Sequence, residues 1–486
     1  MYPWKASILL DKQSATPVYL QIANAISREI VAGRLGTGQK VPGSRQMADL
    51  LGVNRKTVAT AYDELMAQDW LEIIPARGTF VSHNLPIVHP QSLPASSSHQ
   101  TSEASSAFAF PALVPTLQAP SSLLRITDGS PDGRLAPVAS LYQRCKSISV
   151  QSPRREPLRY GDDRGDAKLR HTLARYLRET RGLACSPEQI LITRGSQMGI
   201  YLFLRLLLQP EERVIVGRPN YYEADQVVLR CGGQLLTVPV DEQGLDTDAV
   251  ASLCKQYPIR ALYVTSHHHY PTTVTLSPER RVRLLQLAQQ YHFAIIEDDY
   301  DYDFHYASSP LLPLASLDTQ GTVVYVGSFT KCIAPAVRIG YVVAPENVIQ
   351  SMAAYRRTVD RQGDPVLENA LAGWIEDGEL PRHLKKSVKI YRQRRDFFCT
   401  LLQNQLGQWV QFVQPAGGMA VWTVFSSTID LLALDTYVRT QGISLEGVAH
   451  WQPYHAIRMG FASLNEEEMV RGVKVVRKGI ERQMVL

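Results

Sequence analysis

The sequence has 486 residues, of which 45% are hydrophobic and 20% are charged, and this composition predicts a globular protein of at least two domains. It excludes a fibrous chain and a disordered one. The formal net charge is only +5, so any affinity for nucleic acid must come from a local basic surface rather than from the whole molecule.

Cysteine usage and hydropathy predict the compartment. The six cysteines are scattered without a CxxC pair, which argues against a disulfide framework or a zinc site and favours a reducing environment. The N-terminus shows no signal-peptide pattern, and no stretch approaches the roughly 20 apolar residues that span a bilayer. We therefore expect a cytoplasmic protein that does not associate with membranes.

Residues 1–82 show the element order of a winged helix-turn-helix. Apolar residues at helical spacing predict a first helix from Pro17 to about Gly33. A second helix follows with Ser44 as its N-cap, and a third begins at Asn54. Two short strands close the segment, Leu71–Ile74 and residues 79–81. Helix, short helix, turn, helix and hairpin together predict a DNA-binding domain.

The third predicted helix carries the residues that would read DNA. Its first turn holds Arg55, Lys56 and Thr57, two cations and a hydroxyl on the turn that a recognition helix inserts into the major groove. Arg45 on the preceding helix and Arg77 at the tip of the wing lie beside it. A charged first turn is also typical of an ordinary solvated helix face, so this pattern by itself leaves both interpretations open.

Residues 83–123 separate this head from the rest of the chain. Prolines alternate with serines there, and Glu103 is the only charged side chain. Such a segment buries too little apolar surface to offset the entropy of ordering it, so we expect an extended linker. The second domain would then cover residues 124–486.

Short apolar runs alternate with helical segments in residues 124–486. Continuous hydrophobicity in these runs predicts strands covered on both faces, and hence an α/β domain with a largely parallel sheet. Functional residues should lie just beyond the carboxyl ends of the strands. The predicted strands cover residues 190–193, 214–216, 261–265, 294–296 and 323–326.

Lys331 and Asp298 each follow one of these strands. An amine at a strand end, such as that of Lys331, can form a Schiff base with an aldehyde cofactor. A carboxylate at the bottom of the pocket, such as that of Asp298, can keep a pyridine nitrogen protonated. Tyr300 could donate to the phenolic oxygen of the cofactor ring, or it could simply pack at the end of the strand.

The same region offers donors for a phosphate and a stacking ring. Gly195, Ser196 and Gln197 open a helix, whose exposed N–H groups favour an anion. Ser328 and Arg338 add a hydroxyl and a positive charge near Lys331. Tyr221 follows a strand and could stack on the face of the cofactor ring. Each signal is weak alone and gains weight in combination.

Residues 15–82 resemble the GntR-type winged helix. The resemblance lies in Val41-Pro42-Gly43-Ser44-Arg45, in Leu51 to Val58, in Ala61-Tyr62-Asp63-Glu64-Leu65 and in Arg77-Gly78-Thr79-Phe80-Val81. It implies that Arg45, Arg55, Thr57 and the wing glycine Gly78 contact double-stranded DNA.

The rest of the chain resembles fold-type I aminotransferases, and the combination with the head resembles the MocR/GabR family of regulators. The matching segments occur in order along the chain: residues 159–165, 265–271, 297–300, 328–331, 334–341 and 457–461. The resemblance implies pyridoxal 5′-phosphate on Lys331. It also implies that Arg458 binds the carboxylate of an amino-acid-like effector and that Tyr160 reaches the cofactor phosphate of a neighbouring subunit. Family members are typically homodimers in which each head packs against the other subunit.

Departures from the family pattern limit what can be carried over. His267-His268-His269 replaces the usual Ser-His-Gln, and Thr273 replaces a common glycine. Glu223 occupies a region where a relative that senses γ-aminobutyrate has an arginine, which argues against the same ligand for this chain. The three histidines do not predict a metal site, because adjacent residues of an extended segment point to opposite faces and no carboxylate or cysteine lies within a few positions.

Three hypotheses follow. The leading one is a transcriptional regulator whose DNA binding changes when an amine-bearing effector exchanges onto the Lys331 aldimine, or when the cofactor itself binds. The second is a working aminotransferase that carries a DNA-binding head. The third keeps the large domain as a dimerisation platform with an empty pocket.

Overall fold

The computed structural model describes residues 2–11, 13–86, 123–151, 159–306 and 311–484. The chain divides into two compact units, residues 1–115 and 116–486, and each is described here by itself. Most of the predicted linker, residues 87–122, lies outside the described residues, so the predicted domain boundaries at residues 82 and 123 stay predictions.

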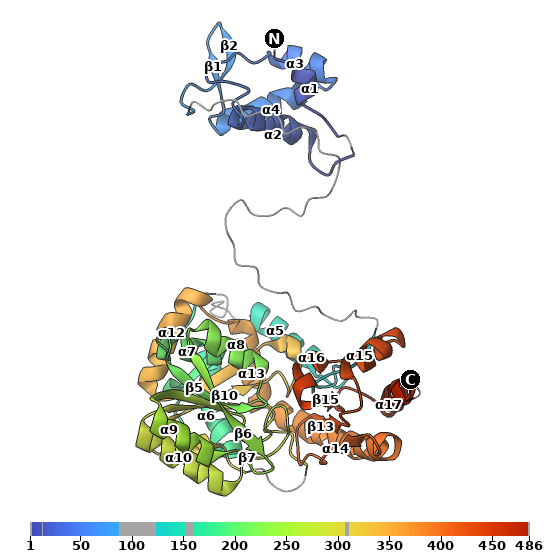
Figure 1. The fold of residues 1–486 in the computed structure, drawn as a ribbon. Coiled ribbons are helices and arrows are strands. Elements are labelled where there is room, and N and C mark those ends of the chain that lie inside the picture. Colours follow the sequence, from blue (N-terminus) through green and yellow to red (C-terminus); the bar gives the residue numbers. More distant parts are fainter. Residues whose placement is uncertain (1, 12, 87–122, 152–158, 307–310, 485–486) are drawn as a thin grey trace. The chain divides into compact units, whose positions relative to one another are not determined.

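The head contains the predicted elements and one more. Its helices bury an apolar core that includes Ile22 and Ile26 of one helix and Val58 and Leu65 of another. The short first helix was not predicted. In chain order (Figure 1) the elements are α1 Trp4–Ser7, α2 Val18–Val31, α3 Ser44–Leu51, α4 Arg55–Ala67, β1 Leu71–Ile74 and β2 Gly78–Val81, with β1 and β2 antiparallel.

The predicted caps of the two central head helices differ in outcome. Asn54 caps α4, because its side-chain oxygen accepts a hydrogen bond of 2.8 Å from the Lys56 amide. The prediction that Ser44 caps α3 is wrong. Gly43 holds the cap position without a side-chain bond, and Ser44 is the first helical residue.

An eight-stranded sheet forms the centre of the large unit. Its order is β4-β11-β10-β9-β8-β5-β6-β7. The five predicted strands pair in parallel or through β11, which runs antiparallel between β4 and β10. The strands are β4 Ile190–Thr193, β5 Arg213–Arg218, β6 Gln234–Asp241, β7 Gly244–Leu245, β8 Ile259–Val264, β9 Ala294–Asp299, β10 Val323–Ser328 and β11 Gly340–Val343.

Successive strand residues enter different cores, as a sheet covered on both faces requires. Ile296 of β9 packs in the core formed with α7, α8 and α12, while its neighbour Ile295 packs in the core formed with α9 and α10. These helices flank the sheet in Figure 1. Their bounds, with those of the other helices before α13, are α5 Val138–Gln151, α6 Ala167–Arg181, α7 Ser196–Leu207, α8 Tyr222–Arg230, α9 Thr247–Gln256, α10 Pro278–Tyr291, α11 Leu314–Leu317 and α12 Glu346–Val359.

The C-terminal part adds two small sheets and the longest helix. β12 Val410–Gln411, β13 Ala420–Phe425 and β15 Ala456–Gly460 form an antiparallel sheet, while β14 Ile443–Leu445 pairs with β3 Leu124–Ile126. The remaining helices are α13 Pro365–Glu376, α14 Glu379–Leu406, α15 Leu431–Thr440, α16 Val448–Trp451 and α17 Glu466–Met484. No helix among the described residues is long and apolar enough to cross a membrane.

A buried arginine fixes the edge strand β4 to α12. Arg356 is completely buried, and its guanidinium donates to the carbonyl oxygens of Ile192 at 2.5 Å and Asp163 at 3.2 Å. It also pairs with Asp360 at 3.0 Å. Since β4 leads directly into the Gly195 segment, this contact helps to place a predicted binding loop.

We expect Arg356→Ala to lower the free energy of unfolding by about 3 kcal/mol, because it leaves buried acceptors without a donor. Chemical denaturation of the full chain measures this. The neighbouring Arg357, whose side chain is 61% exposed, is the matched control. Arg357→Ala should cost roughly 0.5 kcal/mol or less. Equal losses in the two variants would contradict the assignment.

Candidate functional site

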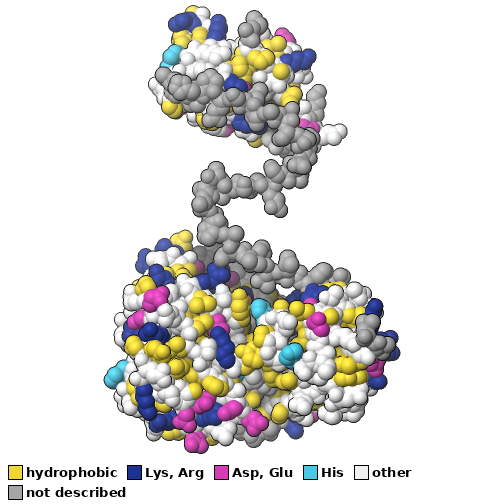
Figure 2. All heavy atoms as spheres, in the orientation of Figure 1, with side chains coloured by type: hydrophobic (Ala, Val, Ile, Leu, Met, Phe, Trp, Pro, Cys, Tyr) yellow, Lys and Arg dark blue, Asp and Glu magenta, His cyan; other side chains and the backbone are white. Residues whose placement is uncertain are grey.

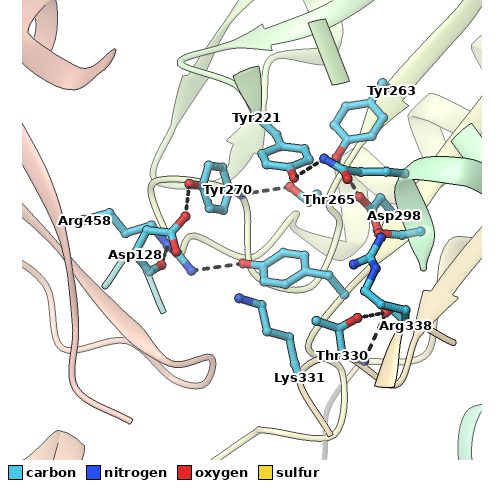
Figure 3. Close-up of a pocket in the computed structure, with 14 residues that line it drawn as sticks. Asp128, Tyr221, Tyr263, Thr265, Tyr270, Asp298, Thr330, Lys331, Arg338 and Arg458 are labelled. Carbon is cyan, nitrogen blue, oxygen red and sulfur yellow. Dashed lines mark hydrogen bonds between the residues drawn. The ribbon is translucent and has the colours of Figure 1, made fainter. Parts of the chain in front are cut away.

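A cavity of about 160 Å³ opens at the carboxyl ends of the central strands. Figure 3 shows its residues facing one another from the segments after β5, β8, β9 and β10. It is lined by Asp128, Ser196, Gln197, Tyr221, Tyr263, Thr265, Tyr270, Asp298, Tyr300, Ser328, Thr330, Lys331, Arg338 and Arg458. The fold thus brings most of the predicted cofactor and effector residues together.

Asp298 lies within β9 and is almost completely buried. Its Oδ2 accepts a hydrogen bond of 2.9 Å from the Tyr263 hydroxyl, whereas its buried Oδ1 has no partner. Burial raises the pKa of this carboxyl to about 7, although the bond from Tyr263 acts in the opposite direction. An orphaned buried carboxyl oxygen is costly unless a cationic or N–H group meets it, and the pyridine nitrogen of pyridoxal phosphate is such a group.

Lys331 follows β10 and reaches into the same cavity. Its Nζ donates to the carbonyl oxygen of Gly129 at 2.6 Å. Burial lowers the pKa of the amine, because the surroundings desolvate its charged form more than the nearby Asp128 stabilises it. A lysine with a lowered pKa offers more of the neutral amine that reacts with an aldehyde.

An anion cradle lies at the start of α7. Gly195 holds the cap position of this helix with φ +79°, and Ser196 begins it. The Arg338 guanidinium lies against Gly195, where an added Cβ would come within 2.8 Å of Nη2. Ser328 donates to Thr330 Oγ1 at 2.9 Å nearby. Helix N–H groups, hydroxyls and an arginine are the donors that a phosphate requires.

Arg458 lies on β15 and is buried beside the cavity. It donates to the carbonyl oxygens of Asp128 at 2.7 Å and Pro271 at 2.6 Å, and to the Tyr300 hydroxyl at 3.2 Å. These three bonds leave two of the five guanidinium N–H groups for a ligand. Tyr300 itself donates to the carbonyl oxygen of His268 at 3.0 Å, so its predicted bond to a cofactor oxygen stays a prediction.

Two predicted residues of the cavity touch each other. The Gln197 amide donates to the Tyr221 hydroxyl at 3.1 Å, and the Tyr221 ring meets Tyr270 edge to face at 5.1 Å. Tyr160, in contrast, does not line the cavity. Its side chain is 76% exposed and lies under the Arg361 guanidinium, at 4.0 Å from the ring centre.

Sequence reasoning missed several lining residues. Thr330 stands next to Lys331, and Thr265 and Tyr270 lie at or near a strand end, so their positions offered a signal. Tyr263 lies inside β8, where the sequence pattern indicates an aromatic residue of the core rather than a site residue. Asp128 follows the three-residue strand β3, far from every other site residue in sequence, and nothing in the local pattern distinguishes it.

The three histidines take separate partners. His267 pairs with Asp299 at 3.2 Å, His268 pairs with Asp301 at 2.8 Å, and His269 lies 2.9 Å from the Thr272 hydroxyl. Two of the three histidines therefore have a carboxylate partner that is distant in sequence. Within the described ranges, no group of three or more His, Cys, Asp or Glu residues is arranged to hold a metal ion.

The head presents its predicted DNA contacts to solvent. Arg45, Arg55, Lys56 and Arg77 are exposed, and none of them forms an ion pair within the described part of the head. Thr57 is half-buried on the same turn, and Gly78 has φ +116° in the wing. Lys40, which was not predicted, is a further exposed cation here, and both Lys40 and Arg77 lie over the Phe80 ring.

The raised pKa of Asp298 predicts a pH dependence of stability in coenzyme-free protein. The folded domain retains a proton up to about pH 7 that the unfolded chain releases near pH 4, so the stabilising contribution is present at low pH and is lost as the pH rises through 7. We expect the Tm of Asp298→Asn minus that of the wild type to increase from pH 5 to pH 8. Calorimetry would contradict this if the difference stays constant.

Comparison with known proteins agrees with both units. Residues 133–476 match the family model "Aminotransferase class I and II", and residues 18–81 match "Bacterial regulatory proteins, gntR family". The probable rhizopine catabolism regulatory protein MocR of Rhizobium meliloti is 28% identical, over 97% of this chain and 95% of its own. The pyridoxine biosynthesis transcriptional regulator PdxR of Corynebacterium glutamicum is also 28% identical, over 95% and 96%.

Among solved structures, a multiple substrate aminotransferase from Thermococcus profundus superposes with a TM-score of 0.70 at 26% identity, covering 75% of this chain and 93% of that one. The class I and II model alone spans well over half of the sequence. The chain therefore belongs to the aminotransferase class I and II family, whose coenzyme is pyridoxal 5′-phosphate, and joins that domain to a gntR-family DNA-binding head in the manner of the MocR-type transcriptional regulators.

Proposed function

We propose that this regulator binds its operator through α4 and the wing and that its DNA binding responds to what occupies the cavity at Lys331. The occupant would be an amino-acid-like effector or the coenzyme itself. One observation carries the proposal: the unpartnered Oδ1 of buried Asp298 and the amine of Lys331 line the same cavity. In a domain that served only as an empty platform, an unpartnered buried carboxyl oxygen beside a lysine would cost free energy without any ligand to offset that cost.

The residues present fit the coenzyme. Asp298 would meet the pyridine nitrogen, Tyr221 would cover the ring, and the cradle of Gly195, Ser196, Ser328 and Arg338 would hold the phosphate. When bound, the coenzyme supplies an aldehyde that bonds reversibly to an amine. Lys331 would provide that amine in the absence of effector, and Arg458 would orient an effector through its two remaining N–H groups.

Signal transmission requires that the effector prefer one arrangement of the heads. We propose a homodimer in which each head packs against the other subunit, because two heads related by twofold symmetry can read two half-sites. The exposed Tyr160 supports this, because a large aromatic side chain left in solvent suits contact with a second copy, where it would reach the partner's cofactor phosphate.

Transamination is the second candidate function. The cavity retains a reactive lysine, an acid for the ring nitrogen and an arginine for a substrate carboxylate, all of which an aminotransferase needs. Steady conversion of an amino acid and a keto acid, without any effect of either on DNA binding, would favour the enzyme over the regulator.

Removing the amine tests the attachment of the coenzyme. We expect Lys331→Ala to lose the visible absorption of covalently held coenzyme and to lose the response of DNA binding to effector. Lys168→Ala, a change on the surface of α6, is the matched control and should keep both. Mass spectrometry after borohydride reduction gives a second readout. A label on any lysine other than 331 would overturn the assignment.

Removing head cations tests the DNA interface. Arg55→Ala should weaken binding to the protein's own upstream DNA by about tenfold to a hundredfold and relax base preference, because Arg55 would read a base edge. Arg77→Ala should weaken binding to all sequences and reduce the salt dependence by about one ion. Arg28→Ala, an equal loss of charge on α2, should change little. A larger effect of Arg28→Ala would contradict the interface.

A further inference from the structure

A second cavity, of about 440 Å³, adjoins the coenzyme site. The two cavities share four lining residues, Asp128, Gln197, Tyr221 and Tyr270, so a ligand held at Lys331 and Arg458 can extend from one into the other. We refer to the second cavity as the outer cavity. Its composition decides which effector side chains can enter it.

Two acidic side chains that form no ion pair with other described residues line this path. Asp128 and Glu223 form no ion pair within the described residues, whereas the other charged groups of the outer cavity do. Glu446 is paired with Arg125, and Arg439 is paired at 2.8 Å with Asp435. Two of the three carboxylates that line the outer cavity, Asp128 and Glu223, therefore have no arginine or lysine at ion-pairing distance among the described residues.

Asp128 lines both cavities and faces Tyr270 in Figure 3. Its Oδ2 accepts a hydrogen bond of 2.6 Å from the Tyr270 hydroxyl. Burial would raise the pKa of this carboxyl, but Lys331, Tyr270 and Arg458 together lower it below the ordinary value. Asp128 is therefore a carboxylate at neutral pH, and a second negative group placed against it would be repelled.

Aromatic rings complete the path. Tyr270 meets Tyr221 at 5.1 Å and Trp451 at 5.9 Å between ring centres, and Tyr222 lies over His450 at 4.7 Å. The Arg458 guanidinium already lies over Tyr270, at 4.7 Å from its ring centre, which shows that a cation is accommodated against these rings. Carboxylates combined with aromatic faces form the surroundings that organic cations prefer.

We propose that the effector is a basic amino acid or a related compound with a second cationic nitrogen. Its carboxylate would bind Arg458, and its distal ammonium would lie between Asp128 and Glu223. Its first amine would replace the Lys331 amine on the coenzyme aldehyde, so that the bond to Lys331 breaks and Lys331 is released as a free amine. This inference rests on the proposed function, since it uses the same cavity. It assigns Asp128 and Glu223 as the residues that select for positive charge and exclude dicarboxylic acids.

The experiment uses full-length, coenzyme-loaded protein and follows the visible spectrum during titration with matched amino acids. Lysine and norleucine differ only by the distal amine, as do ornithine and norvaline. We expect the basic member of at least one pair to produce half of its spectral change at a concentration about tenfold lower than its neutral partner does. Glutamate should act more weakly than either member of that pair.

Variants assign the selectivity to the two acids. Asp128→Asn keeps an acceptor for the Tyr270 hydroxyl but removes the negative charge at the shared wall of the cavities. Glu223→Gln removes the negative charge of the exposed Glu223 side chain. Each variant should reduce the ratio of the concentrations at which the neutral and the basic ligand change the spectrum. The double variant should bring this ratio to about one. Glu242→Gln, on the exposed turn between β6 and β7, is the matched control and should retain the full ratio.

The outcomes separate the two proposals. Equal action of basic and neutral partners, no spectral change with any of these amino acids, or a full ratio in the double variant would overturn the inference. Absence of the coenzyme band before any amino acid is added would instead contradict the proposed function. Because Glu223 is exposed, its variant should fold normally even if Asp128→Asn does not, and the coenzyme band reports folding of both.

Discussion

The buried carboxyl of Asp298 is the constraint on which the large domain depends. It lies in β9, one of the two central strands of a sheet that is covered by helices on both faces, where burying a charge costs free energy. Tyr263, from the adjacent strand, satisfies one oxygen and leaves the other facing the cavity. The proposed contact of this oxygen with a ring nitrogen would offset the cost of burying the acid, so we expect coenzyme binding and stability to be linked.

The neighbouring buried carboxyl groups have partners within the chain. Asp299 accepts from Tyr325 and pairs with His267, and Asp301 pairs with His268. Glu297 accepts the backbone N–H groups of Leu314 and Ala315 at 2.8 and 2.9 Å. Four carboxylates in one short segment are thus buried. Asp299 Oδ1 and Asp301 Oδ2 also lack a hydrogen-bond partner, but of the four residues only Asp298 lines the cavity. Its neighbours support the strand, while Asp298 remains available to a ligand.

Local pattern was sufficient for much of the fold. The five apolar runs and the helix starts at Gly195 and Asn54 agree with the local pattern. Lys331, Asp298 and Arg338, which the pattern placed at strand ends, line one cavity, and so does Arg458, which was expected there from the family resemblance alone. What pattern could not give was contact between segments distant in sequence. β11 is as apolar as the parallel strands of the sheet, so its sequence gives no sign that it runs antiparallel to β4 and β10. Asp128 enters the site only because β3 pairs with β14, more than three hundred residues later.

The anion cradle is closed by contacts that leave no room for a side chain. A Cβ on Gly340 would lie 2.6 Å from the Gly195 carbonyl carbon, and one on Gly195 would meet Arg338. Backbone thus rests on backbone at the junction of β4 and β11. A side chain added here would disturb the proposed phosphate contact, so changes in ligand preference during evolution would have to occur outside this junction. Side chains at the rim of the pocket can be exchanged without disturbing that proposed contact, so we expect differences in ligand range between relatives to arise there.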